Sequence, residues 1–163
     1  MIKFVQLDKA EKDFWLPKLF DLLFENMQSI APSGLSYEQQ KDEWISNVSP
    51  ALDKEPRQVS MCFDEEDLVG YIQYYTREQM LMVEEIQLHS SYHRTMLFYR
   101  FCKHLAAVLP ENIEYVEAYA DRRNLNSQRI MRKLGMEITE CGENSQFVHL
   151  RGLVEPIRDF FRM

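Results

Sequence analysis

The second half of the chain alternates between extended and helical periodicity, and this alternation restricts the fold more than any other feature. Residues 80–89 and 115–120 are short apolar runs of the kind that form strands. Residues 96–109 and 124–134 carry apolar side chains at helical spacing, and Gly135 suits the end of the second helix. A strand–helix–strand–helix unit buries its apolar faces by packing helices on a sheet, so we expect an α/β fold.

The first half and the C-terminal end are predicted to supply the remaining elements. Pro17 suits the first turn of a helix, and Ser36 with Gln39 three residues later resembles a capping box. The additional predicted elements are strands at 2–7, 58–63, 68–75, 137–140 and 147–150, with helices at 17–29 and from Ser36 onward. The predicted order is therefore β-α-α-β-β-β-α-β-α-β-β, a mixed sheet with helices on both faces.

Charge is distributed unevenly along the 163 residues, a length that fits one domain spanning 1–163. Residues 1–91 contain 8 Lys and Arg against 17 Asp and Glu, whereas residues 92–163 contain 11 against 9. The net charge of −7 would repel phosphates, so we expect no nucleic-acid partner. The basic segments 92–109 and 121–136 either face an anionic ligand or are solvated helix faces.

The sequence also argues against several locations and site types. The apolar run from Leu19 to Phe24 is interrupted by Asp21 and is too short to span a bilayer. We therefore expect neither an export signal nor a membrane anchor, and we expect the protein to be cytoplasmic. The three cysteines are widely spaced, which favours reduced thiols over disulfides and predicts no metal site. They are Cys62, Cys102 and Cys141.

Two motifs lie in the strand–helix–strand–helix unit. The first runs from Val83 to Tyr92 into a helix, and the second is Asn124-x-x-Ser127-x-x-x-Met131-x-Lys133-x-Gly135-Met136. Together with the order of elements, they resemble the GNAT superfamily of N-acetyltransferases over essentially the whole chain. The resemblance implies an acceptor side at 1–91, a cofactor side at 92–152 and a C-terminal tail at 153–163.

The resemblance further implies that acetyl-CoA is the acyl donor. Its pantetheine arm would lie along the fourth strand and its pyrophosphate at the turn that opens the next helix. The residues implied to bind it are Gln87, Leu88, His89, Arg94, Thr95, Met96, Leu97, Phe98, Asn124 and Ser127. Asn124 has an alternative role as a helix N-cap.

The turn departs from the family pattern, in which the two positions held here by Met96 and Phe98 are small. Glycine lets a phosphate approach the backbone, so the pyrophosphate-binding loop is degenerate. Arg94 and Arg100 are candidates to replace the lost backbone contacts with charged ones. Alternatively, Met96 and Phe98 are packing residues of a loop that holds no ligand.

Catalysis of amine acylation needs a base for the amine proton and benefits from an acid for the thiolate. Met131 takes the position of the family's tyrosine acid; Tyr119 and Tyr92 are the candidate substitutes, and the alternative is a thiolate that leaves unassisted or by way of water. For the base we prefer Glu85 to Glu84, since strand alternation puts them on opposite faces and the face of Glu85 is polar. His89 is the alternative base.

Two functions remain open from the sequence. The first is acetyl transfer from acetyl-CoA to a primary amine of a small molecule or protein, and the acidic first half would suit a cationic amine. The second is a GNAT-like binding or regulatory module without catalysis, because a fold alone does not establish activity. The aromatic tail at Phe160 and Phe161 suggests a homodimer.

Overall fold

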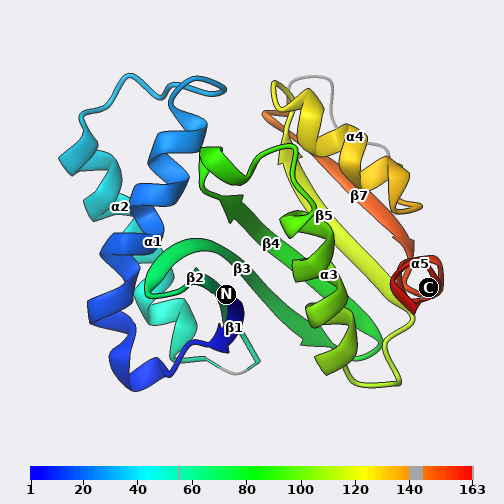
Figure 1. The fold of residues 1–163 in the computed structure, drawn as a ribbon. Helices are drawn as coiled ribbons and strands as arrows, with labels where there is room; N and C mark the ends of the chain where they lie inside the picture. Colours follow the sequence, from blue (N-terminus) through cyan, green and yellow to red (C-terminus); the bar gives the residue numbers. More distant parts are fainter. Residues whose placement is uncertain (55, 140–144, 163) are drawn as a thin grey trace.

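A seven-stranded mixed sheet forms the centre of the computed structural model, which describes residues 1–54, 56–139 and 145–162 (Figure 1). Its strands lie in the order β1-β2-β3-β4-β5-β7-β6. Their bounds are β1 Ile2–Gln6, β2 Gln58–Asp64, β3 Asp67–Arg77, β4 Met80–Leu88, β5 Tyr115–Asp121, β6 Glu137–Ile138 and β7 Phe147–Leu153. Only β4 and β5 pair in parallel, which confirms the predicted mixed sheet.

Helices cover both faces of this sheet, as the alternation of buried residues in β2 requires. Val59 and Met61 pack with the first two helices, whereas Cys62 belongs to the core beneath the third. We call these the α1–α2 face and the α3 face. The helices are α1 Lys12–Met27, α2 Tyr37–Leu52, α3 Leu97–Val108, α4 Leu125–Lys133 and α5 Glu155–Arg162, with 3-10 turns η1 Lys9–Glu11 and η2 Ser90–Tyr92.

Local sequence signals located the start of α2 and the end of α4 but misplaced the start of α1. The capping box of Ser36 and Gln39 is present at the start of α2, and Gly135 after α4 has a φ of 88°, a conformation that disfavours side chains. The expectation that Pro17 lies in the first turn of α1 is wrong, because α1 begins at Lys12 and Pro17 is inside it. A proline there removes one backbone hydrogen bond, and the burial of Leu16 and Leu19 against the sheet offsets that loss.

The C-terminal tail is a helix, α5, that joins the core under α3. Val154 is buried in this core and Ile157 packs against it. The side chains of Phe160 and Phe161, on which the predicted homodimer rests, lie outside the described residues, as does Cys141. The homodimer therefore stays a prediction.

Candidate active site

The strands β4 and β5 separate partway along their length, and this separation defines the candidate site. They pair only between Met80–Val83 and Tyr115–Ala118, so the last pair is Val83 with Ala118. Figure 1 shows the two strands side by side at one end and diverging toward the other. Beyond Val83, the edge of β4 that faces β5 has no strand partner within the described residues. We call this separation of the two strands the cleft; it leaves backbone donors and acceptors of β4 without a strand partner.

A β-bulge lies on β4 at the start of this cleft. Gln73 of β3 pairs with Glu85, but the next residue of β3, Tyr74, pairs with Val83, so Glu84 is the extra residue. The bulge shifts the alternation of side chains by one position along the rest of β4.

The bulge overturns the expectation that Glu84 and Glu85 lie on opposite faces. Val83 and Ile86 both pack in the core of the α3 face, which regular alternation would not allow. Glu85 contacts Trp44 of α2, and Glu84 contacts Arg57, which follows α2 and lies over the ring of Tyr75. Both carboxylates therefore meet partners on the α1–α2 face.

Glu85 is held by two neutral donors. The hydroxyl of Tyr71 donates to Glu85 Oε2 at 2.6 Å, and the indole N–H of Trp44 donates to Oε1 at 3.2 Å. Burial raises the pKa of Glu85, and the hydrogen bonds from Tyr71 and Trp44 oppose that rise. A carboxylate with a raised pKa is a stronger base, as proton abstraction from an amine requires.

Glu84 differs from Glu85 because its partner carries a full charge. Arg57 Nη2 donates to Glu84 Oε2 at 2.7 Å, and Arg57 Nε donates to the other carboxylate oxygen. This two-point ion pair neutralises Glu84 and holds it in place. Of the two carboxylates, Glu85 is therefore better suited to accept a proton.

Tyr119 lies on the opposite wall of the cleft, one residue after the last paired position of β5. Its side chain is 55% exposed, and its ring lies 4.8 Å from the ring of His149 on β7. His149 Nε2 is 2.9 Å from Glu117 Oε1, and its Nδ1 is 2.6 Å from Thr139 Oγ1. Tyr119 is accordingly the tyrosine placed at the cleft.

Sequence reasoning missed His149 and Glu117 as neighbours of Tyr119. Alternation along β5 puts Glu117 and Tyr119 on one face, and that signal was available. The pairing of Tyr119 with His149 depends on the register between β5 and β7, which no local pattern specifies.

Tyr92 and His89, the other candidates for acid and base, have structural partners. The hydroxyl of Tyr92 donates to Asp64, and this hydrogen bond raises the pKa of Tyr92. His89 Nδ1 accepts from the backbone N–H of Ser91 at 3.2 Å and therefore caps the short turn η2. Both residues lie at the end of β4 and not at the bulge.

The predicted cofactor residues of β4 and the following turn divide by environment. Leu88 and Leu97 are buried in the core, while the side chain of Gln87 accepts a hydrogen bond from Asn26 of α1 at 3.0 Å. The carbonyl of Leu88 accepts from Asn26 at 2.7 Å, and His93 Nε2 lies 3.0 Å from it. Part of the exposed edge of β4 is therefore already bonded within the chain.

The turn before α3 retains some features suited to an anion. Arg94 is exposed, and its φ of 64° is in the left-handed region. Thr95 Oγ1 accepts from the N–H of Leu97 at 3.2 Å, which occupies one backbone donor of the first helical turn. Met96 is 67% exposed and extends into solvent, whereas Phe98 is half-buried. The turn thus offers fewer backbone donors to a pyrophosphate than a glycine-rich one.

Asn124 has the capping role that the sequence left open. Its Oδ1 accepts from the N–H of Ser127 at 3.1 Å, so it is the N-cap of α4. Its amide group still carries two N–H donors for a ligand. Nearby, Arg123 holds Asp121 by side-chain and backbone hydrogen bonds and lowers the pKa of Asp121 to about 2, which stabilises the turn between β5 and α4.

The described residues contain no group of three or more His, Cys, Asp or Glu side chains arranged for a metal ion. Among the same residues, no helix has the length and apolar character needed to cross a membrane.

Comparisons with known proteins agree with this fold. The model of the acetyltransferase (GNAT) domain matches residues 12–137. Similar structures include the PaiA N-acetyltransferase from Thermoplasma acidophilum in complex with coenzyme A, 12% identical over 94% of this chain and 99% of that chain, with a TM-score of 0.73. The ribosomal-protein-S18-alanine N-acetyltransferase from Escherichia coli is 12% identical over 94% of both chains, with a TM-score of 0.65.

A GNAT-family acetyltransferase from Staphylococcus aureus Mu50 is 11% identical over 94% of this chain and 99% of that chain, with a TM-score of 0.73. No curated protein matches the sequence. At these identities the structures establish the fold alone, and the family model covers more than half of the chain. This protein belongs to the GNAT acetyltransferase family.

Proposed function

We propose that this protein transfers an acyl group from a CoA thioester, in the first instance acetyl-CoA, to a primary amine. The observation that carries the proposal is the cleft between β4 and β5, with Glu85 on one wall and Tyr119 on the other. In the reaction, the amine nitrogen bonds to the thioester carbonyl carbon and the carbon–sulfur bond breaks. Glu85 takes the proton that the amine loses, directly or through water, and Tyr119 protonates the departing thiolate.

The cofactor side supports this proposal through its backbone. The pantetheine arm carries amide groups, and the unpaired edge of β4 beyond Val83, apart from the Leu88 carbonyl that Asn26 already bonds, offers matching donors and acceptors. Asn124 adds side-chain N–H groups at the start of α4. Arg94 and Arg100, both exposed, can supply positive charge for the phosphates where the turn lacks glycine.

The acceptor side supports a cationic amine through its charge. A groove of about 470 Å³ lies beside the end of β4 on the α1–α2 face, and His89 is part of its lining. Four carboxylates and one lysine line it together with the aromatic rings of Phe14 and Trp15. Carboxylates attract cations, and the Phe14 ring already has the ammonium of Lys18 over it at 5.2 Å. The amine can belong to a small molecule or to a protein.

A second candidate function rests on the turn and on α4. Bulky Met96 and Phe98 hold the positions of small residues, and Met131 cannot donate a proton. These departures favour a binding or regulatory module that keeps the fold without catalysis.

Calorimetric titration of the purified protein with acetyl-CoA separates the two functions. Ligand at 100 times its dissociation constant stabilises the folded state by about 2.7 kcal/mol, which also raises the melting temperature by several degrees. Binding followed by release of free CoA in the presence of a diamine supports the enzyme. Binding without turnover across a panel of amines supports the module, and absence of binding at millimolar acetyl-CoA overturns the proposed transferase.

Acceptor charge is tested by comparing a diamine with a neutral-tailed amine of equal length. We expect the diamine to have the higher kcat/KM. Equal values for the two amines would refute the cationic preference and leave acyl transfer standing.

A further inference from the structure

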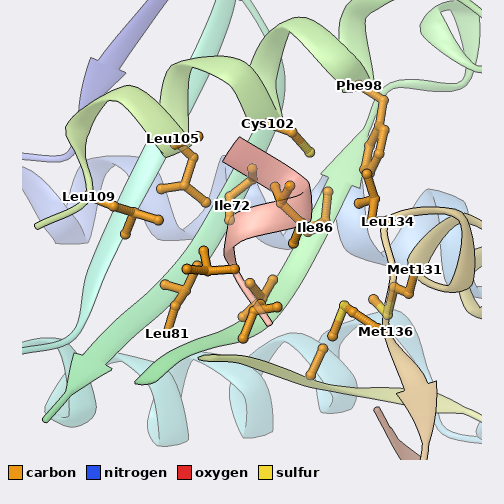
Figure 2. A pocket seen from close by; sticks show the side chains of 16 residues that line it. Ile72, Leu81, Ile86, Phe98, Cys102, Leu105, Leu109, Met131, Leu134 and Met136 are labelled. Carbon is orange, nitrogen blue, oxygen red and sulfur yellow. The ribbon is translucent and has the colours of Figure 1, made fainter. Parts of the chain in front are cut away.

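A partly open apolar cavity lies on the α3 face of the sheet, where β4 and β5 begin to separate. Val83 and Ala118, the last paired residues of the two strands, both line it. Figure 2 shows Phe98, Met131 and Leu134 toward one end of the cavity and Leu81 and Leu109 toward the other. The cavity thus lies between α3, α5 and the sheet, next to the end of the β4–β5 pairing.

The chemistry of the lining determines what can fill this space. All sixteen lining residues are apolar, and the cavity measures about 60 Å³. A buried water needs two to four polar partners, which aliphatic and thioether side chains do not provide. Cys102, the lining residue with a titratable group, stays a neutral thiol because burial raises its pKa to about 12. The space therefore favours an apolar group over water.

The end of the β4–β5 pairing connects the cavity to the acyl donor. Val83 and Ala118 line the cavity, so it lies next to the place where a thioester would sit if the pantetheine arm follows the unpaired edge of β4. The acyl group is attached to the thioester sulfur. A chain longer than acetyl that turns onto the α3 face would enter the cavity toward Leu81 and Leu109.

We propose that this cavity receives the acyl chain of the CoA thioester, so that the preferred donor carries a linear chain of about four carbons instead of acetyl. The proposal rests on the proposed acyl transfer and specifies its donor. A cavity needs roughly 10–15 Å³ for each water-sized group, so a cavity of about 60 Å³ has room for about four to six such groups. Each methylene moved from water into an apolar site contributes about fourfold in affinity.

The test is calorimetric titration of the full chain with acetyl-CoA, butyryl-CoA and octanoyl-CoA. We expect butyryl-CoA to bind at least tenfold more tightly than acetyl-CoA, and octanoyl-CoA to gain nothing further because its chain exceeds the cavity. The matched variants are Ala106→Leu, whose side chain lines the cavity, and Ala107→Leu, which is exposed on the same helix. Ala106→Leu should remove the preference for butyryl-CoA and keep the affinity for acetyl-CoA, while Ala107→Leu should change neither.

The outcomes distinguish this inference from the proposed function. Equal affinity for acetyl-CoA and butyryl-CoA, with turnover of either, overturns the acyl-chain site and leaves acyl transfer standing. A preference for butyryl-CoA that survives in a folded Ala106→Leu variant also overturns it. Absence of binding by all three thioesters overturns the proposed function itself. If Ala106→Leu does not fold, Ala106→Val introduces a smaller obstruction, and the same loss of preference is expected.

Discussion

Replacement of Glu85 by glutamine tests the proposed chemistry most directly. Glu85 is held by Tyr71 and Trp44, and both partners are donors. A glutamine can accept through its Oε1 from one of them, but its amide N–H group would then face the other. General-base catalysis contributes typically 10²–10⁴-fold, so we expect Glu85→Gln to lower kcat/KM by about that factor. The affinity for acetyl-CoA should stay within about twofold, because Glu85 lies on the α1–α2 face.

The pH dependence gives a second readout of the same substitution. Burial raises the pKa of Glu85 above its ordinary value, so the activity of the wild-type protein should rise as the pH increases through that pKa. We call this rise the acidic limb of the pH profile. This acidic limb should be absent in Glu85→Gln. The folded state binds the proton more tightly than the unfolded state, so its contribution to stability is complete below the unfolded pKa and is lost as the pH rises through the folded pKa. Glu85→Gln should therefore become relatively more stable, compared with wild type, as the pH increases.

The assay is release of free CoA, followed from pH 4.5 to 8.5 with thermal unfolding of both proteins at each pH. Glu84→Gln is the matched control, because Glu84 is adjacent but paired with Arg57. We expect this variant to lose less than tenfold in kcat/KM and to retain the acidic limb. A Glu85→Gln protein with wild-type affinity, wild-type kcat/KM and an unchanged acidic limb would refute the assignment of Glu85 as the base.

Three further substitutions test other parts of the site. Tyr119→Phe should lower kcat about tenfold or more without changing KM, and an unchanged kcat in steady-state assays would remove Tyr119 as the acid. The hydrogen bond from Trp44 lowers the pKa of Glu85, so Trp44→Phe should move the acidic limb of the pH–rate profile to higher pH. A shift to lower pH would contradict the hydrogen bond between Trp44 and Glu85. A Cβ added at Gly152 would lie 2.8 Å from the carbonyl oxygen of Gly135. We therefore expect Gly152→Ala to lower the free energy of unfolding, measured with denaturant, by about 1–3 kcal/mol. An unchanged free energy of unfolding would mean that β7 and the end of α4 separate easily.

Local sequence patterns were sufficient for the seven strands, for α1 to α4 and for their order, but they did not predict the C-terminal helix α5. Helical spacing, the capping box at Ser36 and the glycine at Gly135 act over a few residues, so each is visible in the chain before it folds. The motif around Asn124 likewise located α4 and led to the family, which the domain model confirms. Pro17 is the instructive failure, because tertiary packing of α1 on the sheet outweighs the local preference for a helix start.

The arrangement of the site was decided by tertiary contacts. Strand alternation predicted opposite faces for Glu84 and Glu85, but one extra residue in the β3–β4 pairing brings both to the α1–α2 face. The proximity of His149 to Tyr119 depends on the register of β5 and β7, in which the two residues pair although 30 positions separate them. The sequence by itself determined most of the elements that form and which chemical groups they carry, because periodicity and capping are local. Only the tertiary structure decided which carboxylate is hydrogen-bonded by neutral donors and which is ion-paired, because desolvation and pairing depend on neighbours distant in the chain.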